Sequence, residues 1–351
     1  MIVLLFLLPV SATLNDYCGT SELPTTNSNV SADVVWVFFR HGSRTDYQET
    51  RCFPKGEQTK FSCSLQTGFF LKTSGFVKSY LNECAIGQLL DYSEIQMNRI
   101  SIFLIIRYTD FLSSNLFLRS TDVARTLSSL DLLVRDRLSL ESPLVVHVEE
   151  FDSDSLDLRT PHCERAKQLY SDFKFSKIYT ELMNSEEYLS CSKKWENEMK
   201  TKFNIMESGD CLLTAKCASG SKIPITPTDS LSLCVETLMS KLRIIRYSTP
   251  EGKEFCQLAI FPFMNKLGKQ TSLLATHDDT LTCLLVAWEI WDEIWPKYAS
   301  FIVVERHGDT FSVLRDGILI KEGLETVVPF TDEVSWARRC IQNDEVFVVA
   351  M

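Results

Sequence analysis

Two arginines flank a histidine in the segment Arg40-His41-Gly42-Ser43-Arg44. A guanidinium group presents a planar fork of N–H donors that matches two oxygens of a phosphate. A histidine nitrogen held between two such groups can attack phosphorus, which divides one difficult displacement into two easier steps. Gly42 would let the backbone pass close to the bound group, because glycine has no Cβ. The segment predicts a phosphate site, and the competing interpretation of so short a motif is surface charge beside an ordinary loop histidine.

Two later segments carry residues of the same kind. Arg119 stands where Leu118 gives way to a helical pattern near Thr121, so it is placed to meet an anion together with helix N-terminal amides. His277 and Asp278 follow a strand-like run, where a histidine can hold a phosphate oxygen and a carboxylic acid can protonate a leaving alcohol. Each segment alone is explained as well by a helix cap or a satisfied polar contact. Their occurrence together favours one shared site.

The three segments all stand at the ends of predicted strands. Residues 33–39 are a run of β-branched and aromatic residues typical of a buried central strand. Shorter runs at 116–118 and 272–276 precede Arg119 and His277. Because ligand sites in open α/β sheets lie outside the carboxyl ends of strands, we expect these strand ends to meet.

The rest of the chain alternates helical and strand patterns at both ends and is helical in the middle. Helices are expected over about 88–108, 121–138 (with Thr121 as N-cap) and 231–245, and strands over 144–148, 301–305, 310–314 and, after an Asp316-Gly317 turn, 318–320. The predicted fold class is α/β, with a mostly parallel central sheet flanked by helices and an inserted, mainly helical cap domain. The expected boundaries are a signal peptide over 1–13, a core over 33–148 and 251–345, and a cap over 149–250.

Taken together, the motifs resemble the signature of the histidine acid phosphatase family. The matching residues are R-H-G-x-R at 40–44, R-S-T-D-x-x-R-T at 119–126 and H-D at 277–278, with Gly87-Gln88-Leu89 and Arg107-Tyr108 where that family has a helix start and a helix end. The resemblance spans most of residues 34–130 and 270–315. It implies that His41 is the nucleophile that becomes phosphorylated and that Asp278 is the proton donor. It also implies a phosphate-binding set of Arg40, Arg44, Arg119 and His277.

Within the family, the 2-phosphoxylose phosphatase branch is similar in the segments Cys63–Leu65 and Cys84–Gly87 and in the cysteine-rich stretch 211–234. Three positions depart from the family pattern. Asp46 stands where the first motif usually ends in proline, Leu90 stands where the helix start has threonine, and the glycine expected a few residues later is absent. An aspartate near a phosphate pocket can pair with an arginine or weaken anion binding by repulsion. None of these departures removes a residue to which a chemical role is assigned.

Charge and hydropathy exclude several classes of partner. A net charge of −10 and a pI of about 5.2 argue against a general attraction to nucleic acid or to an anionic membrane. Residues 1–10 are apolar and 11–13 are small, which predicts a signal peptide, with an N-terminal core strand as the alternative. No later segment reaches the roughly 18 apolar residues that a membrane span requires.

The twelve cysteines are an even number, which indicates disulfides and an oxidising compartment. No C-x-x-C pair occurs and the histidines are not grouped with cysteines, so we expect neither a metal nor an organic cofactor. Asn29-Val30-Ser31 is the only glycosylation sequon. The predicted location is outside the cell or in the lumen of the secretory pathway, the Golgi and lysosome included.

Four other features are interpreted as structural. Arg306-His307-Gly308-Asp309 repeats part of the first motif, but it lies between two strand-like runs and predicts a hairpin turn. His147 and His162 are expected to be structural or solvent-facing. The spacing of Trp288, Trp291 and Trp295 predicts helix packing rather than a carbohydrate platform. The acidic residues within 149–154 are expected to form a solvated loop.

The predicted activity is hydrolysis of a small-molecule or glycan phosphate monoester through a phosphohistidine on His41. An acidic optimum is expected, because Asp278 must be protonated before it can donate. The first alternative is a member that binds phosphorylated ligands without turnover, which Asp46 and the lost helix-start residues suggest. The second is a phosphotransferase or mutase, since the wider superfamily shares the histidine chemistry, although the signal peptide argues against a cytosolic mutase. The substrate, the disulfide pairing and the oligomeric state stay open.

Overall fold

The computed structural model describes residues 18–19, 30–46, 53–54, 59–65, 80–81, 84–112, 116–135, 145–159, 161–218 and 224–341. The predicted signal peptide and Asn29 of the sequon lie outside these ranges, as does most of the loop between residues 41 and 75. Within them, no helix is both long enough and apolar enough to cross a membrane.

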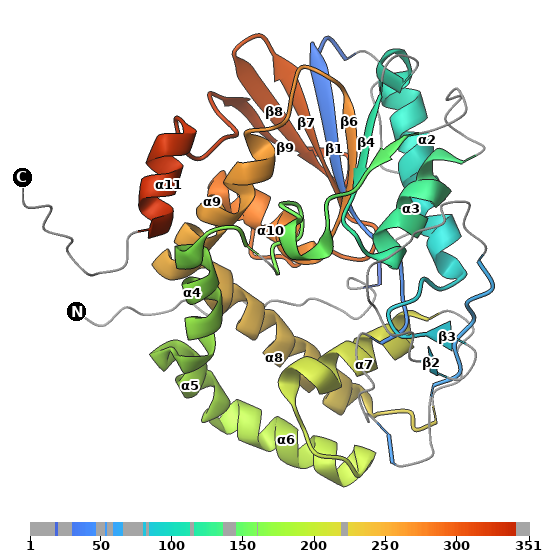
Figure 1. Cartoon of the computed structure of the whole chain (residues 1–351). Coiled ribbons are helices and arrows are strands. Elements are labelled where there is room, and N and C mark those ends of the chain that lie inside the picture. The colour runs from blue at the N-terminus through green and yellow to red at the C-terminus, as the bar shows by residue number, and fades with distance from the viewer. Residues whose placement is uncertain are drawn as a thin grey trace, which may run out of the picture.

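A sheet of seven described strands forms the centre of the molecule, in the order β5-β4-β6-β1-β7-β8-β9 (Figure 1). The strands are β1 (Val34–Arg40), β4 (Phe117–Ser120), β5 (Val146–His147), β6 (Ser272–Thr276), β7 (Phe301–His307), β8 (Thr310–Arg315) and β9 (Ile318–Leu324). The first four strands in this order run parallel, and β7, β8 and β9 continue the sheet as antiparallel neighbours. A separate two-stranded hairpin is formed by β2 (Tyr80–Leu81) and β3 (Cys84–Ala85).

Helices cover both faces of the sheet because β1 is apolar on both of its faces. Trp36 and Phe38 pack with α9 (Pro250–Met264) and α10 (Asp278–Ala287). The alternate residues of β1 belong to the apolar cluster of α2 (Tyr92–Leu112) and α3 (Ala124–Val134) on the opposite face (Figure 1). This period of two is the geometry of a strand. The predicted α/β fold is therefore confirmed.

A mainly helical region lies below the sheet in Figure 1. Its elements are α4 (Glu164–Asp172), α5 (Lys177–Met183), α6 (Glu186–Met199), α7 (Ile205–Cys217) and α8 (Asp229–Tyr247), with single 3-10 turns at Phe151–Ser153 and Phe173–Phe175. Helices α6, α7 and α8 enclose their own apolar cluster around the buried Trp195. In contrast, Leu156, Leu158, Ala166 and Leu169 pack with α9 in the sheet-side cluster. The domain boundary at residue 149 thus stays a prediction. Residues up to Tyr170 pack with the sheet-side cluster, and Phe173 and Tyr179 pack against the cluster of the helical region.

The last helix, α11 (Glu333–Ile341), packs on α4 and α9. The cysteine pairing left open by the sequence includes five disulfides among the described residues: Cys18–Cys217, Cys63–Cys84, Cys163–Cys340, Cys191–Cys234 and Cys256–Cys283. Of these, Cys163–Cys340 joins α11 to the start of α4, and Cys191–Cys234 joins α6 to α8.

Both predicted hairpin turns are present. The segment Arg306–Asp309, which repeats part of the first motif, forms the turn between β7 and β8, with Gly308 at a φ of 61°. Asp316 and Gly317 form the turn between β8 and β9 and both have positive φ. Glycine and aspartate tolerate this left-handed conformation better than most residues do. His307 therefore belongs to a sheet turn.

Three local predictions were wrong. Helix α3 begins at Ala124 with Val123 as an N-cap that makes no side-chain bond, because the Thr121 hydroxyl faces Thr126 and His277 instead. Helix α10 ends at Ala287, so Trp291 and Trp295 lie in the following loop. The acidic segment 149–154 is not a solvated loop, because Asp154 is fully buried and both Glu149 and Asp154 pair with Arg119.

Candidate active site

The carboxyl ends of β1, β4 and β6 place the three sequence motifs side by side. In β1 and β6, Arg40 pairs in register with Thr276, so the residues that follow them, His41 and His277, are neighbours. The centroids of the two imidazole rings are 5.6 Å apart. The expected meeting of strand ends is thus what the parallel register produces.

His41 presents one nitrogen to the pocket as an acceptor. Its Nδ1 lies 2.8 Å from the carbonyl oxygen of Gly42, so Nδ1 carries the hydrogen and Nε2 keeps a free lone pair. Burial, followed by the positive charges of Arg125 and Arg40, lowers the pKa of His41 well below its usual value. A neutral imidazole with a free Nε2 is the form that can attack an electrophile.

Gly42 is required by helix packing. A Cβ at this position would lie 2.6 Å from the Cβ of Ser93 on α2, closer than side-chain atoms approach. The Ser93 hydroxyl in turn donates to the carbonyl of Ser43 at 2.6 Å. The close approach that the glycine allows is therefore to α2, which holds the loop after β1 rigid.

Arg40 is fully buried and joins two parts of the site. Its Nη2 lies 2.7 Å from Asp278 Oδ2, and its Nη1 donates to the carbonyl of Pro296 at 2.8 Å. The guanidinium also stands over the ring of Tyr298, 4.3 Å from the centroid. Arg40 does not line the pocket, so its contacts hold Asp278 and the loop that carries Pro296 and Tyr298.

Asp278 begins α10 and faces the pocket beside Trp295, whose Nε1 donates to Oδ2 at 3.1 Å. Burial raises the pKa of Asp278, but the positive charges of Arg40 and Arg243 lower it more, so the net shift is downward. These charges favour the carboxylate form of Asp278. If Asp278 is to act as the predicted proton donor, a proton must therefore arrive with the ligand or after it.

His277 is surrounded by a second set of polar groups. Its Nε2 lies 3.1 Å from the Thr121 hydroxyl and 3.8 Å from Asp157 Oδ2, and its Nδ1 lies 3.4 Å from an Nη of Arg125. Burial, followed by the charge of Arg125, lowers the pKa of His277 well below its usual value. A neutral His277 acts as a hydrogen-bonding group rather than as a cation.

Arg125, not Arg119, is the arginine of the middle motif that reaches the pocket. Arg119 lies outside the pocket lining, and its Nη2 is 2.7 Å from Glu149 Oε2 and 2.9 Å from Asp154 Oδ1. Arg125 lines the pocket next to both histidines. Both arginines stand in the R-S-T-D-x-x-R-T segment, and Arg125 lies on the first turn of α3, next to the end of β4.

Arg44 connects the loop after β1 to α7. Its guanidinium holds the carboxylate of Asp210 with both arms, with Nη2 at 2.8 Å from Oδ1 and Nη1 at 3.2 Å from Oδ2. Both residues line the pocket. This fork is the geometry that a phosphate would share.

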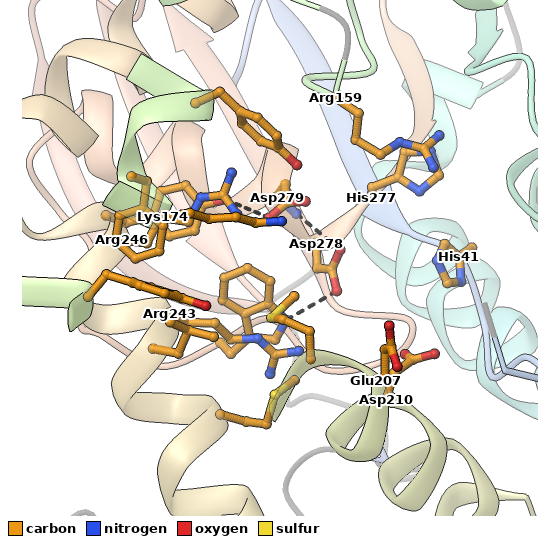
Figure 2. Close-up of a pocket in the computed structure, with 18 of the residues that line it drawn as sticks. His41, Arg159, Lys174, Glu207, Asp210, Arg243, Arg246, His277, Asp278 and Asp279 are labelled. Atoms are coloured by element: carbon orange, nitrogen blue, oxygen red, sulfur yellow. Dashed lines mark hydrogen bonds between the residues drawn. The ribbon is translucent and has the colours of Figure 1, made fainter. Parts of the chain in front are cut away.

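The site opens into a pocket of about 370 Å³ between the sheet and the helical region. Figure 2 shows His41, His277 and Asp278 on one side and Glu207, Asp210 and Arg243 on the side of α7 and α8. Six cationic side chains line the pocket: Arg44, Arg125, Arg159, Lys174, Arg243 and Arg246. An anionic ligand in an acidic protein needs such a local concentration of positive charge.

Part of the pocket lining is aromatic and apolar, and sequence patterns did not identify it. Its members come from helices and loops distant in sequence: Tyr170, Phe173, Tyr179, Met206, Met239, Leu242 and Trp295. Arg243 lies over Trp295 at 4.2 Å from the ring centroid, and Arg246 lies over Tyr170 at 4.1 Å. Three of them lie on α7 and α8 (Met206, Met239 and Leu242), and the others come from α4, the turn at Phe173–Phe175, α5 and the loop after α10, so only the folded chain brings them together.

No protein-family model matches the chain, and no curated protein matches it. Among solved structures, the phytase of Citrobacter braakii superposes with a TM-score of 0.52 at 13% identity, over 82% of this chain and 85% of that one. The Hafnia alvei phytase superposes with a TM-score of 0.54 at 11% identity, over 82% and 84%. For the Klebsiella sp. ASR1 phytase the values are 0.51 and 10%, over 80% of each chain. At such identities the likeness concerns the fold, and the chain has the fold of these phytases: an α/β sheet domain that carries a helical domain.

Proposed function

We propose that this protein is a phosphatase that hydrolyses phosphate monoesters through a phosphohistidine on His41. The observation that carries the proposal is the neutral imidazole of His41, which is held by Gly42 through Nδ1 in a pocket lined by six cationic side chains. The fold shared with phytases supports the same chemistry. The motifs at residues 40–44, 119–126 and 277–278 support it independently of the fold.

The reaction would proceed in two displacements. His41 Nε2 attacks phosphorus while the bond from phosphorus to the ester oxygen breaks, and Asp278 delivers a proton to that oxygen. Water then attacks phosphorus, the bond from phosphorus to His41 Nε2 breaks, Asp278 takes up a proton from the water, and orthophosphate leaves. Arg44, Arg125 and His277 would bind the phosphate oxygens and the charge that develops on them. Arg40 and Arg119, for which direct binding was predicted, would instead hold Asp278 and Asp154.

The depressed pKa of Asp278 requires a source for its proton. A bound phosphate ester would offset the field of the arginines that lowers this pKa, so binding is expected to bring a proton to the carboxyl. At acid pH the ester monoanion carries that proton itself. An acidic optimum therefore follows from substrate-linked protonation.

The substrate is proposed to be a small-molecule or glycan phosphate monoester whose leaving group presents an apolar face. The aromatic wall of Tyr170, Phe173 and Trp295 supports this, because aromatic rings offer broad apolar contact. The resemblance to the 2-phosphoxylose phosphatase branch makes a phosphorylated sugar the specific case to test. Inositol hexakisphosphate is the necessary comparison, since six cationic residues line the pocket and the similar structures are phytases.

Entry into the secretory pathway is proposed as well. Five disulfides among the described residues favour an oxidising compartment, and the apolar N-terminal segment is of signal-peptide length. Expression with the native N-terminus in cultured cells should give processed protein in the lumen or the medium. Unprocessed protein in the cytosol would contradict this part of the proposal.

The first experiment is hydrolysis of an aryl phosphate across acidic to neutral pH. His41→Ala and Asp278→Asn test the proposed chemistry, and His307→Ala is the matched control because it alters the same R-H-G sequence in the β7–β8 turn. Activity that disappears with His41→Ala and survives in His307→Ala supports the phosphatase. Protection by phosphate against heat without hydrolysis would indicate a binding protein, and transfer to an added alcohol faster than release to water would indicate a phosphotransferase.

A further inference from the structure

Asp46 is a buried acidic residue at the edge of the proposed phosphate site, and no step of the mechanism uses it. Its side chain is 5% exposed, and its Oδ1 has no hydrogen-bond partner among the described residues. The other contact of the carboxyl is with the side chain of Thr214 on α7. The backbone holds the residue in place, because Gly87 N donates to the Asp46 carbonyl at 2.8 Å.

Thr214 has a second hydrogen-bond partner besides Asp46. Its hydroxyl donates to the carbonyl oxygen of Asp210, one turn earlier on α7. The contact of Thr214 with Asp46 by itself lowers the pKa of that carboxyl. Ionisation would nevertheless place charge on a buried carboxyl whose Oδ1 has no partner among the described residues, so the geometry of the site favours the neutral acid.

The charges around Asp46 favour the same state. The charged groups that act on it are Arg44 from its own loop and Asp210 from α7, and the segment at Gly87 contributes only backbone groups and an uncharged glutamine, Gln88. Burial and the negative charge of Asp210 raise the pKa of Asp46 to about 8, and Arg44 opposes this only in part. Because Asp210 already occupies both arms of Arg44, one cation faces two carboxyl groups.

We propose that Asp46 is kept as a neutral carboxylic acid and that in this form it positions the Arg44–Asp210 pair for phosphate binding. Asp46 acts through its neighbours: it fixes Thr214 and the first turns of α7, which hold Asp210 and with it the guanidinium of Arg44. Ionised, it would place a second carboxylate beside that guanidinium and draw it away from the pocket. The inference rests on the proposed phosphate site and names one condition under which that site works.

The consequence is a loss of phosphate affinity when Asp46 ionises. For a group with a pKa of about 8, the protonated fraction falls from about nine-tenths at pH 7 to about one-tenth at pH 9. Apparent affinity scales with the competent fraction, so the dissociation constant for orthophosphate should rise roughly tenfold over this interval beyond the titration of phosphate itself.

The test measures orthophosphate binding at pH 7, 8 and 9 by thermal shift or calorimetry, which needs no turnover. Asp46→Asn keeps a donor to Thr214 and cannot ionise, so at pH 9 it should bind phosphate about tenfold more tightly than the wild type does. Asp46→Leu removes the donor and should bind more weakly than Asp46→Asn at every pH. Glu236→Gln is the matched control, because this half-buried carboxyl of α8, whose pKa burial raises to about 7, does not line the pocket.

The outcomes separate this inference from the proposed function. Parallel pH curves for the wild type and Asp46→Asn would overturn the role of Asp46 while leaving a phosphate site in place. The same pH effect from Glu236→Gln would show that any buried carboxyl of the helical region suffices, which also overturns it. Absence of phosphate binding in the wild type and in every variant would contradict both proposals.

Discussion

His41 must stay neutral at acid pH if it is to attack phosphorus there. Its pKa is lowered by burial first and by the charge of Arg125 second, ahead of the charges of Arg40, His277 and Arg44. The acid limb of the activity profile should therefore lie below the ordinary histidine value of about 6.5. The arginine that is proposed to bind the phosphate thus also helps to keep the proposed nucleophile unprotonated.

Arg125→Gln should accordingly have two effects. Loss of a charge-assisted hydrogen bond worth about 1.5–3 kcal/mol should weaken binding of orthophosphate by roughly 10- to 100-fold. Because its charge lowers the pKa of His41, its removal should also move the acid limb of kcat/KM to higher pH. Steady-state kinetics from pH 4 to 7 measure both effects. An unchanged acid limb would mean that burial alone sets the pKa of His41.

Arg119→Gln provides the contrasting case, because Arg119 faces carboxylates and not the pocket. Burial raises the pKa of Asp154 to about 6, and Arg119 holds it down from a higher value. Without Arg119 the folded-state pKa rises further above the unfolded value of about 3.9, so stability is lost as pH rises and is recovered toward pH 4. A loss of about 3 kcal/mol is expected at neutral pH. Denaturant unfolding at the two pH values checks this, and a loss equal at both would contradict the role given to Asp154.

Asp278→Asn should reduce activity in a way that depends on the leaving group. General acid catalysis contributes about 10²- to 10⁴-fold when the departing oxygen is a poor leaving group. An alkyl or sugar phosphate should therefore lose far more activity than an aryl phosphate whose phenol has a low pKa. A series of aryl and alkyl phosphates measures the slope, and an equal loss across the series would exclude Asp278 as the proton donor.

At the scale of elements, α7 forms the part of the site that belongs to the helical region. It brings Glu207 and Asp210 to the pocket. Its N-cap is Asn204, whose Oδ1 accepts from the backbone N–H groups of Met206 and Glu207. By contrast, α3 begins without a side-chain cap, yet it is buried against the sheet and α2. Of these two helices, α3 packs on the sheet and has no side-chain N-cap bond, whereas α7 lies in the helical region and has one.

Asn204→Ala should cost about 1 kcal/mol of stability, the usual value of an N-cap. Fraying of the first turn of α7 should also raise KM, because Glu207 and Asp210 lie within that turn and the next. Thr237→Ala, an exposed position on α8 whose hydroxyl bonds only within its helix, is the control. Urea unfolding and KM are the measurements, and a stability loss without any change in KM would separate the α7 start from the site.

The sequence predicted correctly the two strands that are buried on both faces. Every residue of β1 and β6 is buried, which is why these segments read as near-continuous apolar runs. Element ends were less accurate: the second predicted helix starts at Ala124 rather than Thr121, since the Thr121 hydroxyl is used at His277. The spacing of the three tryptophans predicted a helix that is not there. Trp295 lies in a loop, and its Nε1 donates to Asp278.

At the scale of the whole molecule, two apolar clusters flank the sheet and a third lies in the helical region. The pocket lies between the sheet and that third cluster, so the site depends on contacts across this boundary, such as Arg44 to Asp210. The disulfide Cys163–Cys340 lies elsewhere and fastens α11 to the start of α4.

Cys163→Ala/Cys340→Ala should lower stability and leave phosphate binding in place. The bridge spans 177 residues, whereas Cys63–Cys84 spans 21. In the chain-entropy view the longer loop contributes about 2 kcal/mol more. Removing each bridge in turn and comparing thermal unfolding in the presence and absence of phosphate tests this. A larger loss from Cys63→Ala/Cys84→Ala would show that local packing outweighs loop length.

The sequence alone determined the α/β class, the strands that carry the motifs, and the identities of His41, His277 and Asp278 as neighbours at strand ends. These features follow from local periodicity and from the rule that parallel strands end at one edge. Only the tertiary structure decided that Arg125 rather than Arg119 faces the pocket, that Trp295 reaches Asp278, and that Asp46 is buried against α7. The reason is that side-chain direction and burial depend on contacts between segments that can lie 256 residues apart, which local spacing does not encode.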